Sequence, residues 1–152
     1  MIELNEKTQQ DFLNREWVQR LLDAGVDMSD AKYCIFTGES GKDYVTTIRE
    51  LAMQISSNIV NTYTVSELLY KLHEWIYPTI DGEEYSGGLI VAKDAPFYFA
   101  FYNLKNKEGK KKTEKFFAEF EYPIESLVSL LIQCHKKDIG IATKDTGNIS
   151  DK

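Results

Sequence analysis

Residues 95–103 read APFYFAFYN and residues 114–122 read EKFFAEFEY. Phenylalanines recur at every second position in these stretches, which is the period of a β-strand because successive side chains point to opposite faces of a sheet. A third apolar run, GLIVAK at residues 88–93, comes just before them. Because only short links separate the three runs, they predict three consecutive antiparallel strands.

The register between the two aromatic strands decides which side chains are buried together. We expect one buried layer to be formed by Phe97, Phe99, Phe101, Phe116, Ala118 and Phe120. The opposite face is then expected to carry Tyr98, Tyr102, Phe117, Glu119 and Glu121. Exposed aromatic side chains with charged neighbours often mark a protein contact. This second set is therefore the predicted partner surface, and the alternative is that the N-terminal helix covers it as well.

Three segments have the apolar spacing of amphipathic helices. The first covers residues 6–24, begins with either Thr8 or Asn14 as its cap, and stops at Gly25, which can adopt a positive φ. The second begins at the capping box Thr64–Glu67, in which the two side chains bond each other's backbone amides, and should continue to the residue before Pro78. The third covers residues 123–137.

The stretch Phe36–Asp43, FTGESGKD, resembles part of a phosphate-binding loop. That motif requires a glycine where Phe36 stands, and a serine or threonine that binds magnesium where Asp43 stands. The residues after Asp43 favour a strand, so no helix N-terminus faces an anion. We therefore predict a β-hairpin here and no nucleotide site. Residues 56–61, SSNIVN, are expected to form a loop.

These elements predict an α+β fold, namely an antiparallel sheet of about five strands packed by three helices. Residues 1–140 are expected to form a single domain, because no linker or repeat interrupts them. Residues 141–152 have no apolar period, and we expect a frayed C-terminal tail.

The composition is that of a globular protein, since 43% of the 152 residues are hydrophobic and 28% are charged. The formal net charge of −6 disfavours general binding to phosphate backbones. The N-terminus shows no secretory signal, and no apolar run has the length of a membrane-spanning helix. We therefore expect a cytoplasmic protein with no membrane association.

Residues that could carry chemistry are few and scattered. Cys34 and Cys134 lie in apolar runs and are expected to be buried structural thiols. His73 and His135 lack the spacing of a zinc site. The sequence thus predicts no catalytic residue, no metal and no cofactor, although a small enzyme with a site that sequence cannot reveal stays as an alternative. The acidic turn Asp81–Glu84 lacks the alternating ligands of a calcium loop.

One charge run stands out. Six lysines fall between Lys105 and Lys115, at the link between the two aromatic strands. Lys110, Lys111 and Lys112 at its centre could contact nucleic-acid phosphates. The run lacks arginine for reading bases and aromatic residues for stacking on them. A solvated loop is the favoured interpretation, and nucleic-acid binding is an alternative function.

Three stretches, EWVQRLLDAGVDMSDAKY, TYTVSELLYKLHEWI and YPIESLVSLLIQCHKKDI, flank the aromatic strand pair. Over residues 14–141 this pattern resembles small, functionally uncharacterised proteins carried by prophages and mobile elements of gut anaerobes. The resemblance implies a cytoplasmic, accessory, non-enzymatic protein and assigns no catalytic residue. The leading hypothesis is therefore a non-catalytic interaction protein that binds another protein or associates with itself.

Overall fold

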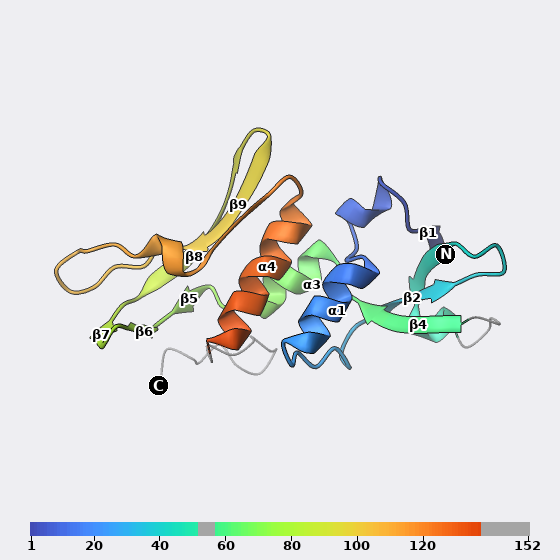
Figure 1. The fold of residues 1–152 in the computed structure, drawn as a ribbon, viewed down its shortest axis with the longest axis horizontal. Coiled ribbons are helices and arrows are strands. Elements are labelled where there is room, and N and C mark those ends of the chain that lie inside the picture. The colour runs from blue at the N-terminus through green and yellow to red at the C-terminus, as the bar shows by residue number, and fades with distance from the viewer. Residues whose placement is uncertain (52–56, 138–152) are drawn as a thin grey trace. The chain divides into compact units, whose positions relative to one another are not determined.

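The computed structural model describes residues 1–51 and 57–137 (Figure 1). The expected α+β class is confirmed, but the strands divide among three antiparallel sheets instead of forming one. The chain forms two compact units, which divide between Glu67 and Leu68. The predicted tail, residues 141–152, lies outside the described residues, and the single-domain prediction stays a prediction.

The first unit contains a sheet of order β1-β3-β2-β4. Its strands are β1 (Ile2–Glu3), β2 (Tyr33–Thr37), β3 (Asp43–Thr47) and β4 (Ser57–Thr62). The antiparallel pair β2 and β3 confirms the predicted hairpin. The prediction of a loop at residues 56–61 is wrong for the described part, because β4 pairs with β2 there. A bulge and the positive φ of Asn58 interrupt the regular alternation of side chains between the two faces of β4, and this alternation is the pattern that would have indicated a strand.

The helices of the first unit are α1 (Arg15–Asp23) and the single turn α2 (Ile48–Leu51), and a 3-10 turn η1 (Thr8–Gln10) precedes α1. Asn14 is the cap of α1, since its side chain accepts a hydrogen bond from the Trp17 amide at 3.0 Å. Gly25 has a φ of 89° and ends the helix as expected. The expected helix from residue 6 is thus shorter and starts at the second of the two proposed caps.

Helix α3 (Val65–Lys71) begins at the predicted capping box. Glu67 accepts from the Thr64 amide at 3.0 Å, and Thr64 accepts from the Glu67 amide at 3.2 Å. The helix ends well before Pro78, because Trp75–Ile76 form strand β5 and pair with Gly88 and Gly87. This long-range pairing overrides the helical spacing that continues to Ile76.

The second unit contains a sheet of order β10-β9-β8-β5 and a separate hairpin. The long strands are β8 (Gly87–Asp94), β9 (Phe97–Tyr102) and β10 (Phe117–Phe120), which confirms the three predicted strands. The hairpin joins β6 (Thr79–Ile80) to β7 (Glu83–Glu84) through Asp81 and Gly82, both at positive φ. A 3-10 turn η2 (Thr113–Lys115) precedes β10.

Helix α4 (Pro123–Lys136) packs against β9 and β10 on one face of this sheet. Under it, Ala100 and Ala118 are paired with each other and are buried. These small side chains let the helix backbone come close, so that Ser126 Oγ donates to the Tyr98 carbonyl at 2.8 Å. The face that carries Ala100 and Ala118 is therefore the one buried under α4, and it also includes the buried rings of Tyr102 and Phe116.

The observed register corrects the predicted buried layer. Phe101 is paired with Phe117, and Phe99 is paired with Glu119. The face of Phe97, Phe99 and Phe101 consequently includes Phe117 and Glu119, whereas Phe116, Ala118 and Phe120 belong to the opposite face. Phe116 and Ala118 are buried as expected, but they share their face with Ala100 and not with the three phenylalanines of β9. The prediction failed because the apolar rings of β9 outnumber Ala100 on its other face, whereas α4 packs on the Ala100 side, where small paired side chains let it come close.

Candidate protein-docking face

Large apolar side chains line the face of the β10-β9-β8-β5 sheet opposite α4. Residues paired across antiparallel strands point to the same face, and Phe101 is paired with both Phe117 and Ile90. Phe97 and Phe99 share that face because side chains alternate along β9. Three adjacent strands thus contribute to one apolar surface.

Strand β5 extends this surface. Trp75 is paired with Gly88, and a Cβ on Gly88 would lie 3.1 Å from the indole ring, so the absence of a side chain lets the ring lie against β8. Because Gly88 precedes Ile90 by two residues, Trp75 is on the same face. We call this surface the aromatic face, and it consists of Trp75, Ile90, Phe97, Phe99, Phe101 and Phe117.

The aromatic face is partly open to solvent. Phe97, Phe117 and Trp75 are 37%, 38% and 48% exposed. The Phe117 ring lies between two neighbours, with its centroid 5.7 Å from that of Phe99 and 5.8 Å from that of Phe101. The rings therefore form a contiguous cluster and not a scatter of single exposed residues, and a cluster of this kind is the usual mark of an interaction site.

The predicted partner surface is divided between the two faces of the sheet. Phe117 and Glu119 lie on the aromatic face, and both are exposed. Tyr98 and Tyr102 lie on the α4 side, where Tyr102 is fully buried and donates its hydroxyl to the His73 carbonyl at 2.5 Å. Glu121 lies in an exposed bend after β10. The sequence analysis expected these residues on one face, whereas the register places Tyr98 and Tyr102 on the face opposite Phe117 and Glu119; their role as partner contacts stays a prediction.

The free edge of the sheet next to the aromatic face is partly closed. Gln133 on α4 accepts a hydrogen bond from the Phe117 amide at 3.1 Å and donates to the Phe117 carbonyl at 2.8 Å. Its side chain thereby occupies the position that another strand would need in order to pair with β10 at this residue. Addition of a further strand at this edge is therefore hindered at Phe117.

The two ends of the aromatic face differ in charge. Glu119 and Asp94 occur near the β8–β9 turn, where Asp94 is paired with Phe97 and Glu119 with Phe99. Lys105 lies beyond the other end of β9 and forms an isolated bridge with Lys111, so the two lysines are directly opposite each other. All four charged side chains are exposed.

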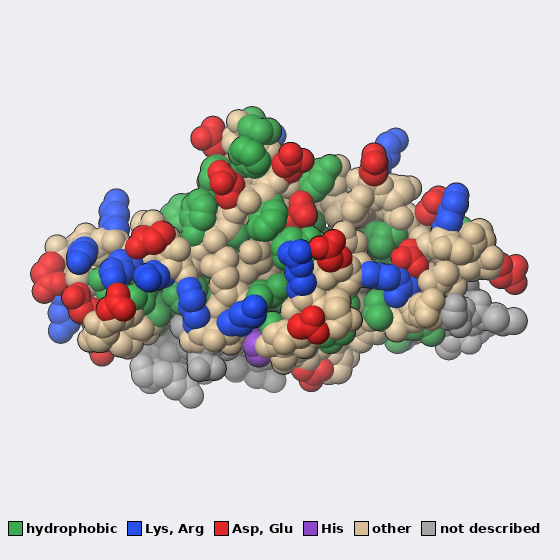
Figure 2. Space-filling view, in the orientation of Figure 1, with side chains coloured by type: hydrophobic (Ala, Val, Ile, Leu, Met, Phe, Trp, Pro, Cys, Tyr) green, Lys and Arg blue, Asp and Glu red, His purple; other side chains and the backbone are tan. Residues whose placement is uncertain are grey.

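A groove of about 400 Å³ connects the apolar surface to this basic end. Trp75, Gly88 and Ile90 line it together with Asn103 and Lys105. Lys105 therefore borders the same surface as Trp75 and Ile90, as its register position predicts. In Figure 2 hydrophobic side chains gather over the β8–β9 hairpin, and Lys side chains gather over the segment between β9 and β10.

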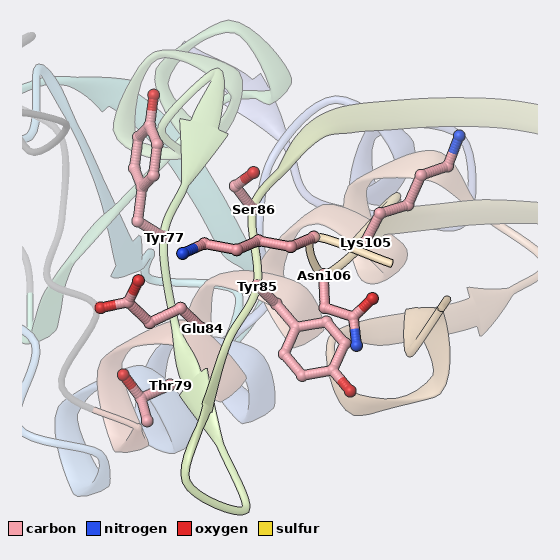
Figure 3. Close-up of a pocket in the computed structure, with 8 residues that line it drawn as sticks. Tyr77, Thr79, Glu84, Tyr85, Ser86, Lys105 and Asn106 are labelled. Atoms are coloured by element: carbon pink, nitrogen blue, oxygen red, sulfur yellow. The ribbon is translucent and has the colours of Figure 1, made fainter. Parts of the chain in front are cut away.

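A second pocket of about 420 Å³ lies nearby (Figure 3). Glu84 and Thr79 lie on one side of it, and Tyr85 and Asn106 lie on the other. Asn106 Nδ2 donates to Glu83 at 2.8 Å, which joins the β6–β7 hairpin to the segment after β9. The pocket is open and is lined mostly by polar side chains.

The lysine run forms a hairpin and not a plain solvated loop. Its turn is closed at Gly109, with a φ of 82°, and the Asn106 side chain accepts from the Lys110 amide at 2.8 Å. Lys112 bonds Asp81 at 2.8 Å, and this hydrogen bond is the main cause that lowers the pKa of the Asp81 carboxyl. Of the predicted nucleic-acid contacts, Lys110 and Lys111 are exposed and Lys112 is already paired.

The thiols are buried and poorly suited to catalysis. Burial raises the pKa of the Cys34 thiol and raises the pKa of the Cys134 thiol to about 12. A thiolate, the reactive form, is therefore disfavoured at both positions. In residues 1–51 and 57–137, no three His, Cys, Asp or Glu side chains are grouped so as to hold a metal ion.

Asp43, which stands where a phosphate-binding loop would need a serine or threonine, has a structural role. Arg15 donates to both of its carboxylate oxygens, at 2.8 and 3.1 Å. The hydrogen bond from Arg15 lowers the pKa of the Asp43 carboxyl, and a bond from Thr37 adds to the effect. The carboxylate thus ties β3 to the start of α1.

No protein-family model, curated protein or solved structure matches this chain. None of the helices in the described parts of the chain is long and apolar enough to span a membrane.

Proposed function

We propose that this protein is a non-catalytic interaction protein that binds another polypeptide on the aromatic face. The observation that carries the proposal is the contiguous cluster of Phe99, Phe101 and Phe117, with exposed apolar neighbours on both sides. Burying such a surface would release the water that it now orders, which is the main driving force of protein association. The buried thiols, with their raised pKa values, agree with a non-enzymatic role.

The cellular setting belongs to the same proposal. The resemblance to prophage and mobile-element proteins suggests an accessory factor that acts in the cytoplasm on a phage or host protein. Nucleic-acid binding is supported less well, since Lys112 is neutralised by Asp81 and no aromatic side chain is interleaved with Lys110 and Lys111.

Site-specific photocrosslinking in living cells tests this proposal. A benzophenone amino acid would replace Phe117 on the aromatic face, and in a matched control it would replace Val91, which is 44% exposed and is paired with Ala100 on the α4 side. We expect a discrete protein adduct from position 117 and none from position 91. Equal labelling at both positions, or none at either, would contradict the proposal.

A further inference from the structure

The arrangement of charge around the aromatic face points to a specific occupant. We infer that a second copy of this chain binds there, face to face and related by a two-fold axis. This inference rests on the proposed docking function and adds the identity of the partner.

The first step is the self-complementarity of the face. Asp94, paired with Phe97, and Glu119, paired with Phe99, lie in the half of the face toward the β8–β9 turn, whereas Lys105 and Lys111 lie beyond the opposite end. A two-fold axis that lies in the interface, parallel to the sheet and perpendicular to β9, turns the two faces toward each other and places the acidic half of each copy on the basic end of the other. The same patch then serves both copies, which is the property of an isologous interface.

The second step concerns the two lysines. Like charges directly opposite each other on neighbouring strands destabilise a sheet. Lys105 and Lys111 are in this arrangement, and both are exposed. In the dimer, carboxylates of the other copy would face this pair and offset the repulsion. A partner with only apolar character would leave the repulsion in place.

The third step is the mode of contact. Gln133 bonds the Phe117 backbone at the β10 edge, so pairing of edges to continue the sheet is hindered there. Two sheets packed face to face lie about 10 Å apart, a distance that aromatic side chains from both sides can fill. From Phe97 to Lys105 the face is about 26 Å long, at about 3.3 Å per residue. This modest length predicts a weak dimer, near the lower limit of stable interfaces.

Charge reversal tests the arrangement with the full chain. One variant combines D94K and E119K, so that both ends of its face are basic. The other combines K105E and K111E, so that both ends are acidic. Sedimentation over micromolar to submillimolar concentrations should show a dimer for the parent chain and about a hundredfold weaker self-association for each variant. An equimolar mixture of the two variants should dimerise again, because every contact then joins opposite charges.

Two further variants control the experiment. F117S should abolish the dimer, and V91S, on the other side of the β8–β9 hairpin, should preserve it. All of the altered side chains are exposed, and circular dichroism would verify that each variant is folded. A parent chain that stays monomeric throughout, a dimer that survives both charge reversals, or a mixture that stays monomeric would each overturn the inference.

Failure of this inference can be told apart from failure of the proposed function. A crosslinked adduct from position 117 with twice the mass of the chain supports the second copy. An adduct of any other mass, with a monomeric parent chain, overturns the dimer but leaves a docking face for a different protein.

Discussion

At the scale of single residues, the reliable signals in the sequence are those that act locally. The capping box of Thr64 and Glu67 and the stop at Gly25 were predicted correctly, because each depends on backbone groups within a few positions. The choice between Thr8 and Asn14 as a cap stayed open, since both have side chains that suit that position.

The capping box allows a first prediction. Thr64→Ala removes the hydroxyl that accepts from the Glu67 amide, so the free energy of unfolding should fall by about 1 kcal/mol. Urea denaturation followed by circular dichroism measures this change. Thr64→Ser keeps the acceptor and should stay close to the parent chain. An equal loss in both variants would show that the methyl group matters more than the cap.

A second prediction concerns pH. Burial lowers the pKa of His73, so its imidazole binds a proton less readily in the folded chain than in the unfolded chain. As the pH falls below the ordinary histidine value of about 6.5, unfolding takes up this proton, and stability declines until the folded pKa is passed. The slope should be at most about 1.4 kcal/mol per pH unit.

Denaturation midpoints between neutral and mildly acidic pH measure this slope. The variant His73→Gln has no proton to bind, so its stability should depend less on pH than that of the parent. The carboxyls of Asp43 and Asp81 also have lowered pKa values, but they titrate below their ordinary range and therefore act at more acidic pH. Identical slopes for the parent and the variant would refute the assignment to His73.

At the scale of elements, the sequence predicted which segments form strands but not how the strands align. Phe116, Phe117 and Phe120 provide apolar side chains for both faces of β10, so hydrophobicity alone could not choose the register. The deciding feature is the paired Ala100 and Ala118, which α4 requires for close packing. The aromatic face could be predicted only in part for the same reason, since a slip by one residue exchanges the two faces.

Strand β5 shows a second limit. Trp75 and Ile76 continue the apolar spacing of α3, and nothing nearby indicates that they pair with Gly88 and Gly87. Strands that lie this far apart in the sequence pair only when the whole sheet assembles, so a local sequence pattern does not predict the pairing.

The link between α4 and the sheet edge provides the third prediction. Gln133→Ala removes both hydrogen bonds to the Phe117 backbone. The free energy of the opening that exposes the Phe117 amide should fall by about 1 kcal/mol, so hydrogen exchange of this amide should be about fivefold faster. NMR of the exchanging amides measures this rate, and the Ala118 amide, which faces β9, should change less. The exposed Lys136 on the same helix is a control, since Lys136→Ala should leave both rates unchanged.

At the scale of the whole molecule, charge is divided between the two units. The acidic excess lies in residues 1–67, whereas residues 68–137 contain as many lysines as acidic residues. The second unit therefore carries charges of both signs, and Asp94, Glu119, Lys105 and Lys111 border its aromatic face. The boundary between the units falls inside α3, between Glu67 and Leu68, so one helix belongs to both.

Because α3 belongs to both units, we predict that the two units unfold together. Each unit contains one buried thiol that can report its unfolding, Cys34 in the first and Cys134 in the second. Their burial and raised pKa values should make both nearly inert to a thiol reagent in the folded chain. The variants Cys34→Ala and Cys134→Ala each leave a single thiol, whose labelling in increasing urea reports the opening of one unit. We expect each labelling midpoint to coincide with the circular dichroism midpoint of the same variant, since loss of either unit removes half of α3. Labelling of one thiol at clearly lower urea would instead show that the two units unfold independently.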